Sequence, residues 1–150
     1  MYSRYREVCH TSIHMKPSVI VWDLETVPDL AGFAAANDLV GKSDVEIREA
    51  LGDKFPKHIY HSIVCIGALI AHWEPDHWAV DAVGAPHVGE RTEKELISAF
   101  CNRIAELGPR LVTFNGHSFD LPVYRVAGLR DHRDMSLGCR PQGPVPIWAE

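Results

Sequence analysis

The fold predicted for this chain is decided by the stretch Val19-Ile20-Val21-Trp22-Asp23-Leu24-Glu25-Thr26-Val27-Pro28. Its first half is β-branched and aromatic, which is typical of a buried strand, and proline cannot continue a β-ladder. Strand side chains alternate between two faces, so Asp23 and Glu25 project from the same face near the carboxyl end. Because two close carboxylates repel each other, the spacing favours a divalent cation between them. The alternative is a strand that simply runs out into solvent through polar residues.

The composition predicts one globular domain. The chain has 150 residues, of which 46% are hydrophobic and 23% are charged, and this is enough for a single core. The sequence shows neither an apolar run of membrane-spanning length nor a signal peptide, so we expect a cytoplasmic protein without a membrane partner. The four cysteines, Cys9, Cys65, Cys101 and Cys139, form no Cys-x-x-Cys pair, which favours free thiols.

The net charge of −5 is unevenly distributed along the chain. Residues 17–120 contain 8 Lys and Arg against 16 Asp and Glu, whereas residues 121–140 contain four arginines and two aspartates. An acidic body does not attract nucleic acid through its overall field, so a polyanion would have to be held by metal and local cations. The candidate cations could touch a phosphate backbone or belong to a solvated loop; they are Lys54, Lys57, His58 and His61.

The rest of the pattern alternates between strands and helices. Segments with strand composition are residues 62–71, 78–83 and 111–114. Segments with helical patterning are residues 29–37, the segment that ends at Gly52, the segment that ends at Gly108-Pro109, and the residues after Ser118. Capping boxes open the second and third helices, at Ser43 with Glu46 and at Thr92 with Glu95. Ser118 is expected to cap the last helix, which places Asp120 near its positive end.

Two motifs in this order resemble the DEDD-type 3′–5′ exonucleases of the ribonuclease-H-like fold. They are Val-Trp-Asp-Leu-Glu-Thr-Val-Pro on the first strand and Leu-Val-Thr-Phe-Asn-Gly-His-Ser-Phe-Asp-Leu-Pro before the last helix. More narrowly, residues 19–129 look like the predicted stand-alone exonucleases related to the proofreading domain of family B DNA polymerases. The resemblance implies an α/β fold, namely a ribonuclease-H-like mixed sheet flanked by helices.

The resemblance also implies a mechanism and a set of site residues. Two Mg²⁺ or Mn²⁺ ions about 3.5–4 Å apart would bridge the scissile phosphate at the 3′ end of a nucleic acid, in the first place single-stranded DNA. The implied catalytic residues and metal ligands are Asp23, Glu25 and Asp120. The implied substrate contacts are Thr26, Asn115 and Phe119, and for Phe119 plain core packing is compatible with that role.

The third motif of these exonucleases is absent from this sequence. It should supply a fourth carboxylate as Tyr-x-x-x-Asp or His-x-x-x-x-Asp on a later helix, and neither spacing occurs, although Asp131 and Asp134 are available. We therefore expect a loose leader (1–16), an incomplete exonuclease domain (17–130) that is truncated at its C-terminus, and a Pro/Gly-rich irregular tail (131–150). One metal could be lost with the motif, and the alternative function is a non-catalytic remnant or a nucleic-acid-binding or interaction module.

Overall fold

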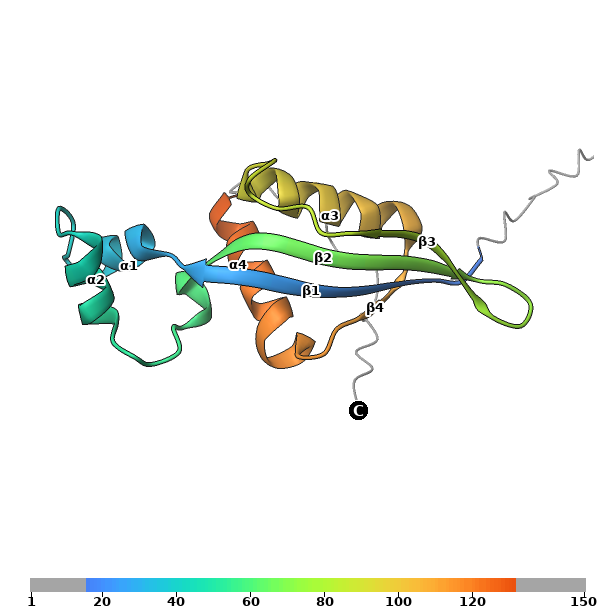
Figure 1. Ribbon diagram of the computed structural model, residues 1–150, viewed down its shortest axis with the longest axis horizontal. Helices are drawn as coiled ribbons and strands as arrows, with labels where there is room; N and C mark the ends of the chain where they lie inside the picture. Colours follow the sequence, from blue (N-terminus) through green and yellow to red (C-terminus); the bar gives the residue numbers. More distant parts are fainter. Residues whose placement is uncertain (1–15, 132–150) are drawn as a thin grey trace, which may run out of the picture.

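The computed structural model describes residues 16–131, which form an α/β fold with a mixed four-stranded sheet flanked by helices (Figure 1). The strands are β1 (Ser18–Pro28), β2 (His61–Trp73), β3 (Trp78–Gly84) and β4 (Arg110–Val112). The helices are α1 (Leu30–Ala36), α2 (Asp44–Leu51), α3 (Glu93–Leu107) and α4 (Leu121–Asp131), with a 3₁₀ turn η1 (His58–Tyr60) and a π-helical turn η2 (Gly116–Asp120). This arrangement is consistent with a ribonuclease-H-like fold and confirms the predicted fold class.

The structure describes only part of the expected domain division. Residues 1–15 and 132–150 lie outside the described part, and so do most of the predicted leader and all but one residue of the predicted tail. Lys16, the last residue of that leader, forms an ion pair with Glu74 at 2.6 Å. Between residues 16 and 131 there is no helix long and apolar enough to cross a membrane.

The strand order β3-β2-β1-β4 makes β1 an interior strand. β1 pairs antiparallel with β2 over its whole length, and it pairs parallel with β4, with Val21 opposite Val112. The first and last strands of the chain are therefore neighbours in the sheet. Because these two strands are parallel, their carboxyl ends lie at the same edge of the sheet, where ligands bind in many open α/β sheets.

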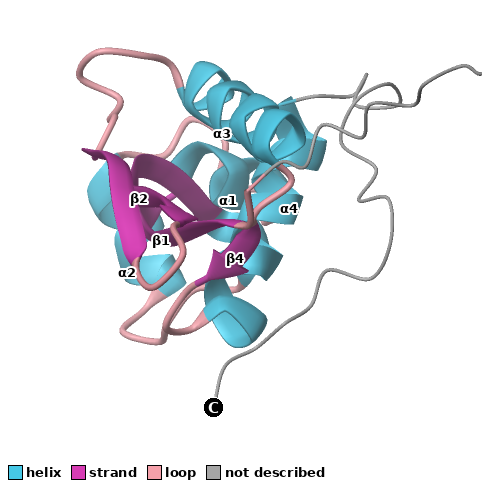
Figure 2. Ribbon diagram, turned by 90° about the vertical axis from the view of Figure 1, so that its right-hand side faces the viewer, coloured by secondary structure: helices cyan, strands magenta, loops and turns pink. Residues whose placement is uncertain are grey.

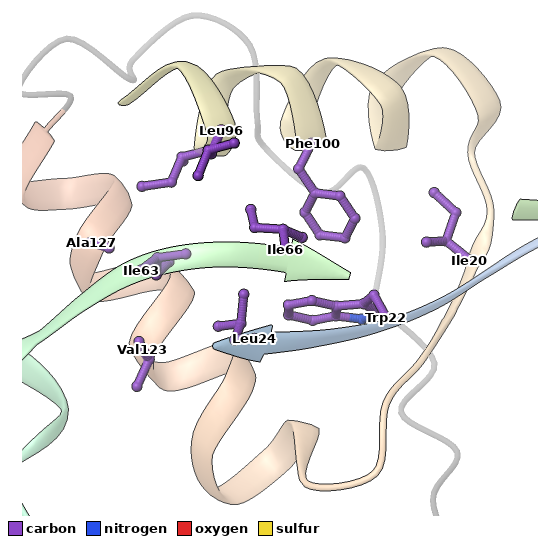
Figure 3. Packing of buried hydrophobic residues seen from close by; sticks show 10 residues of the cluster. Ile20, Trp22, Leu24, Ile63, Ile66, Leu96, Phe100, Val123 and Ala127 are labelled. Carbon is purple, nitrogen blue, oxygen red and sulfur yellow. The ribbon is translucent and has the colours of Figure 1, made fainter. Parts of the chain in front are cut away.

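The hydrophobic core lies between one face of the sheet and the helices α3 and α4 (Figures 2 and 3). Its central ring is Trp22, whose centroid lies 5.0 Å from Phe100 of α3 and 5.9 Å from Tyr124 of α4. Each fully buried Ile or Leu in such a core stabilises the fold by roughly 1.5–3 kcal/mol. The buried residues of the cluster are Ile20, Trp22, Leu24, Ile63, Ile66, Leu96, Ile97, Phe100, Val123 and Ala127.

The alternation along β1 sends its two carboxylates to the other face. Ile20, Trp22 and Leu24 are buried in the core, whereas Asp23 and Glu25 between and after them are exposed. The apolar residues of β1 thus fix the strand against α3 and α4. The same anchoring presents both carboxylates on the face that these two helices do not cover.

The helix starts follow the local sequence signals. Both predicted capping boxes are present: the Ser43 and Thr92 side chains accept the backbone N–H of Glu46 and Glu95, whose carboxylates accept the cap N–H in return. α3 ends at Gly108, which has φ +52°, a left-handed conformation that glycine adopts without strain. The two capping predictions and the predicted end of this helix are confirmed.

Residues 29–60, which we call the excursion, lead from the end of β1 to the start of β2. They contain α1 and α2, which project beyond the end of the sheet at the left of Figure 1, while the β2–β3 hairpin lies at the opposite end. The backbone N–H of Asp29 donates to the carbonyl of Tyr60 at 2.8 Å, and the rings of Phe33 and Tyr60 meet edge to face at 5.0 Å. These contacts close the base of the excursion, so its tip can differ in conformation without moving the sheet.

Two local predictions before α4 are wrong. The predicted buried strand 111–114 ends early, because β4 stops at Val112 and Phe114 is 100% exposed. Ser118 does not cap α4, because the chain first makes the turn η2, in which the N–H of Phe119 donates to the carbonyl of Asn115 at 2.9 Å. The extra turn inserts backbone between strand and helix, and it leaves Asp120 immediately before α4. The prediction that Pro122 lies in the first turn of that helix is confirmed.

Candidate active site

Asp23 and Glu25 lie side by side on the exposed face of β1, near its carboxyl end. In the antiparallel ladder they stand opposite Gly67 and Cys65 of β2, and a bulge follows directly between Glu25 and Thr26. Burial, together with the charge of Glu25, raises the pKa of the Cys65 thiol. Neither Cys65 nor Cys101 forms a disulfide within the described residues, and Cys9 and Cys139 lie outside them.

Asp120 occupies a different environment from the two strand carboxylates. Its side chain is almost completely buried, at 1% exposure, and it accepts a hydrogen bond from the hydroxyl of Thr113. Thr113 follows Val112, the last residue of β4, which pairs with Val21 two residues before Asp23, so the parallel ladder ends close to Asp23 on β1. Sequence positions almost one hundred residues apart thus converge at the carboxyl ends of two neighbouring strands.

The pKa of Asp120 depends on its burial and on the charge of Asp23, which is consistent with this convergence. Burial is the main factor that raises the pKa of Asp120, and the negative charge of Asp23 raises it further. Hydrogen bonds from the Thr113 hydroxyl and from the backbone of Asn115 act in the opposite direction and lower it. The carboxyl of Asp120 is therefore buried within the field of a second carboxylate, an arrangement that a bound cation would stabilise.

The donor set fits a hard divalent cation in chemistry, because Asp23, Glu25 and Asp120 offer only carboxylate oxygens. None of the ion pairs found within residues 16–131 involves these three side chains, so no lysine or arginine of that part neutralises them. That part of the chain nevertheless contains no group of three or more His, Cys, Asp or Glu side chains placed to hold a metal ion. The structure couples Asp23 with Asp120, while shared metal binding by all three carboxylates stays a prediction.

Gly116 of the turn η2 packs closely against Thr113, the residue that follows β4. A Cβ atom at this position would collide with the methyl group of Thr113, the residue whose hydroxyl holds Asp120. Gly116 is buried, and the Thr113 side chain that it faces is half-buried and hydrogen-bonded to Asp120. Glycine is therefore required here for the close approach of the turn to the residue that orients the carboxylate. Short π-helical turns of this kind occur frequently at functional sites.

The Gly116→Ala substitution is expected to loosen this arrangement. The new methyl group would displace Thr113, and crowding of this kind destabilises a protein by about 1–3 kcal/mol. Loss of the Thr113 hydrogen bond should also raise the pKa of Asp120 further, because that bond lowers it. Thermal unfolding and a carboxyl NMR titration measure the two effects.

The matched control for this substitution is Gly84→Ala on β3, where a Cβ would meet only Pro86 at an ordinary 4.0 Å. It should leave both the stability and the pKa of Asp120 unchanged. Equal behaviour of the two alanine variants would contradict a specific fit between Gly116 and Thr113.

Two of the three predicted substrate contacts meet at a histidine that the sequence did not single out as buried. Thr26 Oγ1 lies 3.0 Å from His61 Nδ1, and the ring of His61 packs edge to face on Phe119 at 5.1 Å. The Nε2 atom of His61 lies 3.2 Å from the carbonyl of Pro56, which can only accept. In a neutral ring Nε2 therefore donates to that carbonyl, and Nδ1 accepts from the Thr26 hydroxyl.

The third predicted substrate contact, Asn115, is exposed at the start of η2. Phe119 is half-buried and also packs against the hydrophobic cluster, so the alternative of core packing applies to it as well. His61 had been grouped with surface cations, but it is only 4% exposed. Its place at the head of a long apolar run, Ile63 to Ile70, was the one signal in the sequence that could have indicated burial.

The mixed four-stranded sheet flanked by helices is consistent with the ribonuclease-H-like class. The profile of one protein family matches residues 53–136, more than half of the chain, and that family is described as a predicted 3′–5′ exonuclease related to the exonuclease domain of PolB. The chain belongs to this family. The matched segment contains Asn115, Phe119 and Asp120, whereas Asp23 and Glu25 precede it. No curated protein matches the chain.

Proposed function

We propose that this chain is a metal-dependent 3′–5′ exonuclease that hydrolyses phosphodiester bonds at the 3′ end of single-stranded DNA. The observation that carries the proposal is the buried carboxyl of Asp120, held by Thr113 within the field of Asp23, in a member of an exonuclease-related family. A buried carboxyl in the field of a second carboxylate is costly in its charged form, and a bound cation would offset that cost, which favours a metal-binding role.

In this proposal Asp23 and Asp120 hold Mg²⁺ or Mn²⁺, and Glu25 joins them from the same face of β1. Such an ion, when bound, polarises the scissile phosphate and lowers the pKa of a water molecule. Asp23 and Glu25 are exposed and can change rotamer, whereas Asp120 is fixed by Thr113. Asp120 is therefore the rigid ligand, and the two strand carboxylates adjust to it.

The surrounding residues have supporting roles in the proposal. Thr26 and His61 orient each other through their hydrogen bond next to Glu25, and the ring of His61 supports Phe119, the neighbour of Asp120. Asn115 is exposed on the turn beside Thr113, where its amide can contact the sugar-phosphate backbone of the 3′ nucleotide. Residues at the carboxyl ends of both β1 and β4 thus position the terminal nucleotide.

The proposal is tested by a time course on a 5′-labelled single-stranded oligonucleotide in Mn²⁺. We expect a ladder of products shortened from the 3′ end, formed far more slowly than by a relative that carries the third motif. The recognised motifs lack one metal ligand and the group that orients the attacking water. The reaction should therefore be slow, because misplacement of about 1 Å at a reacting centre can cost a hundredfold in rate. A non-hydrolysable 3′-terminal linkage should suppress the ladder.

The assay is repeated with alanine substitutions of two exposed aspartates, one at the proposed site and one remote from it. Asp23→Ala should abolish the ladder, and Asp76→Ala, in the turn between β2 and β3, should leave it intact. Mn²⁺ binding, followed calorimetrically with the same variants, should be lost only in Asp23→Ala. A ladder of equal strength in the Asp23 variant would contradict the proposed site.

A second candidate function is that of a non-catalytic nucleic-acid-binding module that keeps the fold. It is favoured by one observation, namely that residues 16–131 contain no preformed group of three metal-binding side chains. Asp23-dependent Mn²⁺ binding without any ladder would support this candidate and refute the exonuclease proposal.

A further inference from the structure

An aromatic ring at the rim of the candidate active site is both exposed and firmly supported. Phe55 lies on the connector between α2 and η1 and is 73% exposed. Its ring meets Phe119 at 5.4 Å with an interplanar angle of 62°, and it meets His61 at 5.1 Å with an angle of 39°. An exposed aromatic ring that is held in place by neighbouring rings offers a face on which an unpaired base can stack.

The supports of Phe55 connect it to the carboxylates. Phe119 is the residue directly before Asp120, and His61 is hydrogen-bonded to Thr26, the residue directly after Glu25. The ring therefore packs on Phe119, which directly precedes one proposed metal ligand, and on His61, which is hydrogen-bonded to the residue that follows another. If the 3′ end of a single-stranded DNA reached Asp120, the neighbouring bases of that DNA would lie next to the Phe55 ring.

The connector around Phe55 is locally basic within an acidic body. Lys54 and Lys57 are exposed, and no ion pair formed within residues 16–131 includes either of them. The ring of His58 lies 6.1 Å from Phe119 on the same aromatic base. Cations beside an exposed ring are complementary to single-stranded nucleic acid, which carries phosphates and unstacked bases.

We propose that Phe55 is a stacking platform for an unpaired base near the 3′ end of single-stranded DNA, with Lys54 and Lys57 contacting the adjacent phosphates. This inference rests on the proposed exonuclease function and identifies how its substrate is held. Stacking of a base on an aromatic side chain contributes about 1–3 kcal/mol to binding, so loss of the ring should weaken binding about tenfold.

The platform is tested by fluorescence anisotropy with a labelled oligo(dT) in EDTA, where binding is measured without hydrolysis. Phe55→Leu keeps an apolar side chain and removes the π-face, and it should weaken binding about tenfold. Phe55→Tyr should bind like the unchanged protein. The matched control is Trp78→Leu, which removes an aromatic residue that is 43% exposed on β3, in the hairpin at the opposite end of the sheet (Figure 1).

An abasic oligonucleotide of the same length separates stacking from backbone contact. The unchanged protein and Phe55→Leu should bind it equally, because it offers no base to stack. Replacing both lysines by glutamine should weaken binding to both oligonucleotides and lower the salt dependence by about 1.4 units for two single-strand phosphate contacts.

Several outcomes would overturn the platform: no oligonucleotide binding by the unchanged protein, binding of oligo(dT) by Phe55→Leu at full strength, or an equal loss on the abasic strand. A dimer in sedimentation that Phe55→Leu dissociates would also overturn it, because the ring would then be an interface between copies. Failure of the proposed function gives a different result. Phe55-dependent binding without any Mn²⁺-dependent ladder refutes the exonuclease and keeps the platform.

Discussion

Replacing Asp120 by asparagine is expected to reduce metal-dependent trimming of a 3′ end by about a hundredfold or more, because one rigid ligand is lost at the reacting centre. Asparagine has nearly the same shape, and its amide oxygen can still accept the hydroxyl of Thr113. The variant should therefore remain folded while Mn²⁺ binding falls. Calorimetric titration with Mn²⁺ and the ladder assay measure the two losses separately.

The same substitution should not lower stability at neutral pH. Burial and the charge of Asp23 raise the pKa of Asp120 above its ordinary 3.8, so between that value and the raised value the folded chain binds more protons than the unfolded chain. Stability therefore falls as pH increases above 3.8, and by neutral pH the raised pKa of Asp120 has lowered the stability of the metal-free fold. Asparagine removes the charge, so the melting temperature at pH 7 should equal or exceed that of the unchanged protein.

The pH dependence separates a functional from a structural role of Asp120. The advantage of the Asp120→Asn variant should disappear at pH 3, where the aspartate is protonated in both states. Adding Mn²⁺ at pH 7 should reverse the order, because only the unchanged protein gains stability from the ion. A variant that melts lower at every pH, with or without metal, would mean that Asp120 is simply a structural residue.

The Arg130→Met substitution is expected to cause the largest loss of stability. The guanidinium of Arg130 donates two hydrogen bonds of 2.7 Å to Glu93 at the start of α3, and single bonds to Asp29 at 3.1 Å and to the carbonyl of His61 at 3.2 Å. Methionine would leave two carboxylates without this cation in a half-buried position. Breaking a fully buried pair costs about 3–5 kcal/mol, and the 29% exposure of the Arg130 side chain reduces this to about 2–3 kcal/mol.

Thermal unfolding measures this effect, with an expected decrease in melting temperature of about 10 °C. The matched control is Arg125→Met, which removes an exposed arginine from the same helix and should change stability by less than about 0.5 kcal/mol. A further variant, Glu93→Gln, should also be destabilising, because Glu93 additionally accepts the backbone N–H of Ile63 at 2.6 Å. Equal melting temperatures for the two arginine variants would show that the ion pairs contribute nothing.

The strands and the capped helices could be predicted because their signals are local. Alternation along β1 separates Trp22 from Asp23 whatever the partner strands are, and the capping boxes at Ser43 and Thr92 depend on residues only three positions away. The grouping of Asp23, Glu25 and Asp120 into one site rested instead on motif order and family resemblance, and it stays a prediction.

The remaining features depend on contacts between distant segments, which a single sequence does not display. The turn η2 lies between Thr113 and Asp120, whose side chains are hydrogen-bonded to each other, and Phe114 lies in solvent although its residue type suits a strand. Similarly, the sequence indicates Arg130 only as one of four arginines in residues 121–140, since its carboxylate partners lie 37 and 101 positions away.

The excursion has a consequence for how this family can diversify. Residues 29–60 leave and rejoin the sheet through adjacent strand ends, tied by the bond from Asp29 to Tyr60, and α1 packs on α2 and η1 beyond the end of the sheet. Insertions or deletions at its tip would therefore leave the strand register intact. Because the return limb carries Phe55, a change in the length of this one loop could alter which strand ends are accepted while the carboxylates keep their positions. The residues that would contact the substrate and those that would perform the chemistry thus lie on separate segments of the chain, so relatives could differ in substrate preference without loss of the chemistry.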